Sequence, residues 1–95
     1  MPQYRTQGRI IADILATARD MNTDGQGVGI TTLLRRGNVS YTRMSKLIVD
    51  LVGAGLLLQE ILEKNSRYRI SDKGVRFLEA YSQFDEFAQS FGLKL

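Results

Sequence analysis

The side chains best suited to chemistry lie close together between residues 40 and 46. This run carries hydroxyl, phenol and cationic groups, namely Ser40, Tyr41, Thr42, Arg43, Ser45 and Lys46. Groups of these types hydrogen-bond to the base edges and phosphate oxygens of duplex nucleic acid. The same groups could also form an ordinary solvated helix face. We favour contact with nucleic acid because of the elements that precede and follow this run.

Cationic residues are segregated along the chain, although the net charge is only +3. No acidic residue lies between Asp24 and Asp50, and Asp72 alone interrupts the basic run that begins at Lys64. The two basic segments contain Arg35, Arg36, Arg43 and Lys46, then Lys64, Arg67, Arg69, Lys73 and Arg76. From Glu79 onward the chain is slightly acidic. Charge grouped in this way is expected of a surface that faces phosphates, although a charge cluster alone usually marks a solvated face.

Residue types that serve catalysis or metal binding are scarce. The chain has no cysteine and no histidine, which excludes disulfides, thiolate catalysis and the commonest general base and metal ligand. Carboxylates, hydroxyls and lysines remain, but they form no recognisable pair of nucleophile and base. We therefore expect no catalytic residues, no metal site, no cofactor and no enzymatic activity.

The bulk composition predicts one small domain. A chain of 95 residues can bury a single hydrophobic core, and its 43% hydrophobic and 24% charged content is ordinary for a globular protein. No apolar run approaches the roughly 18 residues that cross a bilayer, and the N-terminus lacks the apolar stretch of a signal peptide. We expect no membrane partner and a cytoplasmic, nucleoid-associated location.

Hydrophobic spacing predicts two helices before the polar run. Apolar residues recur at three- and four-residue steps over about residues 7–21, which is the stripe of an amphipathic helix. The turn-forming residues 22–27 predict a loop. Residues 30–36 suit a short second helix that ends at Gly37.

The third helix is predicted over residues 40–53 and holds the polar run described first. Ser40 suits the N-cap, because its hydroxyl can accept from a free backbone N–H in the first helical turn. Gly53 and Gly55 can end the helix, because glycine adopts positive φ readily. The apolar stripe of this helix comprises Met44, Leu47, Ile48, Leu51 and Val52.

A hairpin and a last helix complete the chain. Residues 56–62 form a short apolar run, residues 63–66 a polar turn, and residues 67–70 alternate apolar and polar side chains. This pattern predicts two antiparallel strands. Ser71 suits the N-cap of a last helix over about residues 72–91.

The order of these elements predicts a mainly α (α+β) winged helix-turn-helix with a two-stranded wing. We assign residues 1–71 to the winged-helix domain and residues 72–95 to a C-terminal dimerisation helix. Helix 40–53 would read the major groove of double-stranded DNA, and the wing at residues 63–67 would follow the backbone. The predicted DNA contacts are Arg35, Arg36, Ser40, Tyr41, Thr42, Arg43, Ser45, Lys46, Lys64, Asn65 and Arg67.

Four arginines outside the third helix have less specific assignments. Arg35 and Arg36 end the second helix, where cations also favour the negative end of the helix dipole, so a structural role is open for both. Arg5 and Arg9 could add backbone contacts from an N-terminal arm.

The last helix carries a heptad pattern. Its seam steps by 4, 3, 4, 3 and 4 residues through Phe77, Tyr81, Phe84, Ala88, Phe91 and Leu95. This is the spacing of a coiled coil. The seam could instead fold back onto the domain's own core. A helix of about 20 residues is roughly 30 Å long, however, so its far half would extend beyond a small domain. We therefore predict a homodimer that forms through this helix.

Two stretches carry a family resemblance. Residues 36–41 (Arg-Gly-Asn-Val-Ser-Tyr) and 68–78 (Tyr-Arg-Ile-Ser-Asp-Lys-Gly-Val-Arg-Phe-Leu), with Leu47, Leu51 and residues 55–57 between them, resemble small archaeal winged-helix proteins of about ten kilodaltons. The likeness covers most of the chain. It implies that the last helices pair as an antiparallel coiled coil and that the dimer binds duplex DNA. It also implies recognition-helix contacts from Ser40, Tyr41, Thr42, Arg43 and Lys46.

The chain departs from that family in two respects. The loop at residues 22–27 is longer than usual, and the chain is less basic than a bulk chromatin protein. Lower charge weakens the electrostatic term that does not depend on DNA sequence. Between a transcriptional regulator and an architectural chromatin-type protein, this favours a site-specific regulator.

A different class of function stays open at this stage. Winged helices also serve as protein-interaction modules without direct DNA binding, because a fold does not decide function. The aromatic seam would then receive a different subunit. From the residues alone, the coiled coil could be parallel or antiparallel.

Overall fold

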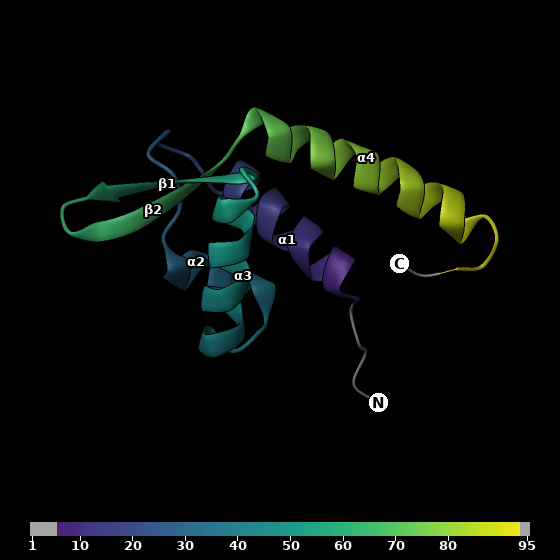
Figure 1. The fold of residues 1–95 in the computed structure, drawn as a ribbon, viewed down its shortest axis with the longest axis horizontal. Helices are drawn as coiled ribbons and strands as arrows, with labels where there is room; N and C mark the ends of the chain where they lie inside the picture. The colour runs from purple at the N-terminus through teal and green to yellow at the C-terminus, as the bar shows by residue number, and fades with distance from the viewer. Residues whose placement is uncertain (1–5, 94–95) are drawn as a thin grey trace.

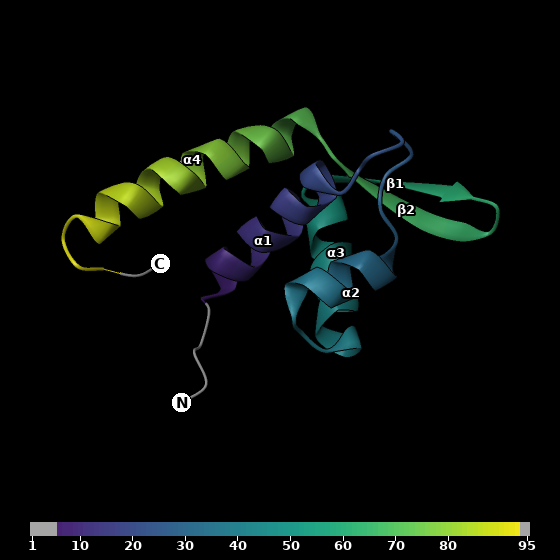
Figure 2. The ribbon, with the colours of Figure 1, turned by 180° about the vertical axis from the view of Figure 1, so that it is seen from behind.

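The computed structural model describes residues 6–93, which contain four helices and one two-stranded antiparallel sheet. The elements in chain order are α1 (Gln7–Asp20), α2 (Ile30–Gly37), α3 (Tyr41–Gly53), β1 (Leu57–Leu62), β2 (Asn65–Ile70) and α4 (Asp72–Gln89). Their type and order confirm the predicted winged helix and its long C-terminal helix. The hairpin and α4 leave the three-helix body in opposite directions (Figures 1 and 2).

Side-chain hydroxyls cap the N-termini of three helices. The sequence predicts two of these caps, Ser40 and Ser71. The Thr6, Ser40 and Ser71 oxygens each accept from the backbone N–H three residues later, at 3.1, 3.2 and 2.9 Å. Each bond satisfies one of the donors that a helix N-terminus leaves free. These caps fix where α1, α3 and α4 begin.

The hydrophobic core lies where α1, α2 and α3 meet the base of the hairpin. Its largest fully buried side chains are Ile14, Leu15, Leu33, Met44 and Leu57. Gly37, predicted to end α2, lies within the helix and is buried. A Cβ at this position would lie 2.8 Å from Met44 Cε, so Gly37 permits close packing, and Asn38 takes the left-handed conformation that ends α2, with φ 53°.

The hairpin, called the wing below, is tighter than the sequence predicts. β1 and β2 pair from Leu57 opposite Ile70 to Leu62 opposite Asn65, which leaves a turn of two residues. Glu63 and Lys64 both have positive φ, 50° and 68°, as a type I′ turn requires. The predicted four-residue turn is wrong because its last two residues belong to β2.

A third backbone segment joins the wing at its base. The Val28 N–H donates to the Tyr68 carbonyl oxygen and the Tyr68 N–H donates to the Val28 carbonyl oxygen, both at 2.8 Å. Val28 therefore pairs with β2 on the edge opposite β1. The loop at residues 22–27 leads directly into this pairing.

The first turn of α4 lies against the start of β1. The Ser71 hydroxyl donates to the carbonyl oxygen of Gly55, two residues before β1 begins, at 2.6 Å. Gly74 is buried, and a Cβ added there would collide with the carbonyl oxygen of Leu56. The close approach of these two backbones sets the direction in which α4 leaves the body.

We expect Gly74→Ala to lower the free energy of unfolding by about 1–3 kcal/mol, because the new methyl group must displace the Leu56 backbone. Gly53→Ala is the matched control, since no atom lies within 4 Å of a Cβ at that exposed helical position. The control variant should be about 0.5–1 kcal/mol more stable than the parent. Urea unfolding followed by circular dichroism measures both, and equal stability of the two variants would contradict the close approach.

Candidate nucleic-acid interface

α3 turns most of the predicted contact residues toward solvent. Thr42 and Lys46 are exposed and lie one turn apart, on the side of the helix opposite the buried Met44, Leu47, Ile48 and Leu51. Tyr41 is also exposed, and Ser45 is partly buried beside them. The helix therefore gathers four of the six polar residues of the predicted run on or beside one exposed face.

The other two residues of the run have partners within the protein. The Ser40 hydroxyl accepts from the Arg43 backbone N–H and serves as the cap of α3. The Arg43 guanidinium donates to the Gln7 side-chain oxygen at 3.5 Å, the upper limit of a hydrogen bond, and so reaches toward the start of α1. Both residues are exposed at the N-terminal end of α3.

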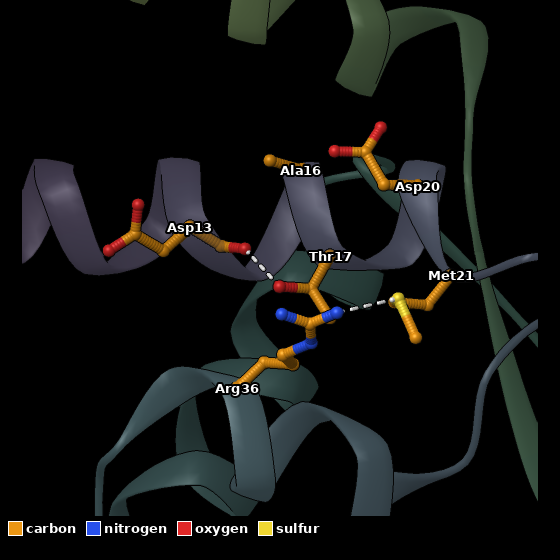
Figure 3. Close-up of a pocket in the computed structure, with 6 residues that line it drawn as sticks. All are labelled: Asp13, Ala16, Thr17, Asp20, Met21 and Arg36. Atoms are coloured by element: carbon orange, nitrogen blue, oxygen red, sulfur yellow. Dashed lines mark hydrogen bonds between the residues drawn. The ribbon is translucent and has the colours of Figure 1, made fainter.

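Arg36 faces α1 across a surface hollow of about 260 Å³. Its lining residues are Asp13, Ala16, Thr17, Asp20, Met21 and Arg36 (Figure 3). The Arg36 guanidinium lies 3.3 Å from the Met21 sulfur, whereas the Asp20 carboxylate points away from it. The hydrogen bond from Arg19 is the main cause that lowers the pKa of Asp20, and the charge of Arg36 adds a weaker effect. The Arg36 side chain thus extends from α2 toward α1, and both Arg35 and Arg36 are exposed.

Two cations of the wing bind other groups of the protein. Arg67 donates from Nη2 to the Gly27 carbonyl oxygen at 2.8 Å, and its Nε is buried without a hydrogen-bond partner. Arg69 forms an ion pair with Glu60 at 3.0 Å. Lys64 and Asn65 are exposed at the tip. Arg67 therefore binds the loop before α2, whereas the other two predicted wing contacts, Lys64 and Asn65, stay exposed.

The predicted seam of α4 lies on two neighbouring faces of the helix. Tyr81 packs against the core, and Ala88 is buried. Phe84 and Phe91 are 60% and 68% exposed, and Phe77 is partly exposed. Phe87, which the seam does not include, is 66% exposed, and its ring meets that of Phe91 edge to face at 5.2 Å. We call Phe77, Phe84, Phe87 and Phe91 the phenylalanine face; Leu95 lies outside the described residues.

An ion pair holds α4 to α1 beside this face. Arg9 Nη2 lies 2.7 Å from Asp85 Oδ2, and the Asp85 side chain is only 12% exposed. The Arg9 guanidinium also stacks over the Tyr81 ring, 5.4 Å from its centre. Arg9 therefore lies within α1 and binds α4, so its assignment to an N-terminal arm is wrong. Arg5 lies outside the described residues.

Other kinds of site have little support in residues 6–93. No group of three or more acidic side chains in this range is placed to hold a metal ion. None of the four helices that the structure describes is both long enough and apolar enough to cross a membrane.

The fold and the exposed face of α3 together define a winged helix-turn-helix of the type that DNA-binding proteins use. Residues 4–89 match the family model of the winged helix-turn-helix, and the chain belongs to that family. A search of curated protein sequences found no match.

Three solved structures show the same fold at low sequence identity. The DNA-binding protein Sso10a-2 from Sulfolobus solfataricus has 22% identity and a TM-score of 0.78 over 92% of this chain and 85% of that one. F-93 of SSV1 has 17% identity and a TM-score of 0.60 over 96% of this chain and 97% of that one. A MarR-family transcriptional regulator from Rhodococcus sp. RHA1 has 15% identity and a TM-score of 0.64 over 77% of this chain and 51% of that one. The chain thus has the fold of DNA-binding and regulatory proteins.

We expect Arg9→Ala to lower the free energy of unfolding by about 1–2 kcal/mol, because it leaves the largely buried Asp85 carboxylate without its cation. The effect stays below that of a fully buried pair because the Arg9 side chain is 40% exposed. Arg19→Ala is the control, since it removes an equally short but exposed ion pair with Asp20. Thermal unfolding at low salt compares the two, and equal losses would show that burial of Asp85 has no consequence.

Proposed function

We propose that the protein is a dimeric double-stranded DNA-binding protein that reads the major groove with helix 40–53 and follows the backbone with the wing at residues 63–67. The observation that carries this proposal is the exposed polar face of α3 within a fold that places such a helix in the major groove. Sso10a-2, which shares the fold, is itself a DNA-binding protein.

The contact residues divide by what they can recognise. Tyr41, Thr42 and Ser45 offer hydroxyl groups to base edges, and Lys46 offers a cation to a phosphate or a base. At the wing, Lys64 and Asn65 suit phosphate oxygens, because contacts to the backbone neutralise charge without reading sequence. Arg35 can add a phosphate contact from the exposed end of α2.

The internal use of several arginines favours a transcriptional regulator over an architectural chromatin-type protein. Arg9, Arg67 and Arg69 bind groups of the protein itself. Fewer cations are then available to phosphates, which reduces the binding that does not depend on sequence. Base contacts from α3 must supply a larger share of the affinity.

We infer that the phenylalanine face is the dimer interface. Three of its rings are at least 60% exposed, and an exposed apolar stripe on a long helix is typical of an interaction surface. An antiparallel pairing centred on Phe84 sets Phe77 of one copy opposite Phe91, just after the end of α4, of the other, because each lies seven residues from the centre. This pairing also brings Arg76 near the negative C-terminal end of the partner helix.

Lys46→Ala is expected to weaken binding to all duplexes by a similar factor if Lys46 contacts phosphate. It should also reduce the slope of log K against log salt by about 1 per protomer. Lys73→Ala is the control, because it removes the same charge from a lysine that donates to the Ala54 carbonyl oxygen. Fluorescence anisotropy across a salt titration measures both. The absence of duplex binding at low salt, or affinity that does not fall as salt rises, would refute the DNA-binding proposal.

Phe84→Glu is expected to convert the dimer to a monomer, because two carboxylates would face each other at the centre of the interface. Ser82→Glu adds the same charge at an exposed position away from the phenylalanine face and should leave a dimer. Light scattering on the pure proteins gives the mass of each. A monomeric parent chain would contradict the homodimer and favour a different protein subunit as the occupant of this face.

A further inference from the structure

Val49 occupies the exposed side of α3, although it is apolar. Its side chain is 69% exposed, and it follows Lys46 by three residues and Thr42 by seven. Residues at these spacings share one strip along a helix. Val49 therefore belongs to the same outward strip as the polar groups that are proposed to enter the major groove.

Helix stability does not explain a valine at this position. A β-branched side chain loses rotamer freedom in a helix and is a weaker helix former than alanine. The side chain also takes no part in the hydrophobic core or among the apolar residues packed against it. Isolated apolar residues are common on protein surfaces, but this one continues the strip that carries the proposed contacts, one turn beyond Lys46.

We propose that Val49 is a specificity-determining residue that recognises the methyl group of a thymine in the major groove. This inference rests on the proposed DNA-binding function. The C5 methyl of thymine is the apolar group that base pairs present in the major groove, and aliphatic side chains contact it there. Burial of the valine methyl groups against it removes apolar surface of both partners from water.

The spacing along α3 limits where this thymine lies. Thr42 and Val49 are seven residues apart, which is roughly 10 Å along the helix axis. The rise of duplex DNA is about 3.4 Å per base pair, so a helix that follows the groove places the two contacts about three base pairs apart. Val49 would therefore select an A·T pair about three steps from the base pairs that meet the start of α3.

The test removes either the C5 methyl group of the thymine or the γ-methyl groups of Val49. Duplexes selected from a random pool by the parent protein are resynthesised with single dT positions replaced by dU, which lacks only the C5 methyl. For the parent protein, dU at one position in a single half-site should weaken binding about fourfold, as expected for the loss of one buried methyl group. For Val49→Ala, which keeps the helix and leaves the core untouched, dT and dU at that position should bind equally.

Threonine at residue 49 serves as the conservative control. Val49→Thr has nearly the same shape and keeps one methyl group, so it should retain part of the preference for dT over dU. A parent protein that binds duplexes with no position sensitive to dU, or a Val49→Ala variant with the same sensitivity as the parent, would overturn the role of Val49 while DNA binding stands. A parent protein that binds no duplex at low salt would overturn both proposals.

Discussion

The backbone contact between Gly74 and Leu56 decides how the outer elements leave the three-helix body. α3 ends two residues before Gly55, the wing begins two residues after it, and α4 begins two residues after the end of β2. The hydrogen bond from the Ser71 hydroxyl to Gly55 and the close packing at the buried Gly74 hold the end of α3, the start of β1 and the start of α4 together. The wing and α4 therefore extend from this junction in opposite directions (Figure 1). In the proposed dimer, this junction would set the separation of the two recognition helices.

Internal ion pairs and hydrogen bonds reduce the positive charge that the protein presents to a ligand. Arg67 satisfies the carbonyl oxygen of Gly27, Arg69 neutralises Glu60, and Arg9 neutralises the largely buried Asp85. Each of these contacts joins two different elements of the fold. The cations of α3 and of the wing tip stay exposed, so the fold concentrates the positive charge available to a ligand on a smaller surface than the chain as a whole would suggest.

The two neighbouring faces of α4 differ in their roles: one packs within the protein, and the other is exposed. α1 covers the side that contains Leu78, Tyr81 and Asp85, and it leaves the phenylalanine face open. A heptad seam in the sequence combines these two rows because residues four and three apart alternate between them. The apolar periodicity of α4 therefore reflects its packing on α1 as well as the proposed contact with a second copy.

The sequence by itself determined the order of the elements, because hydrophobic spacing, the serine caps and the turn residues act over a few neighbouring positions. It also located the polar run on α3, since the apolar stripe of that helix fixes which side faces the core. Only the tertiary structure decided which cations are bound internally, because Arg9 and Asp85 are 76 residues apart and no local pattern links them. It likewise placed Val28 beside Tyr68 and assigned Tyr81 to the core rather than to the exposed seam. These features depend on contacts between segments that are far apart in the chain, and local sequence patterns do not specify such contacts.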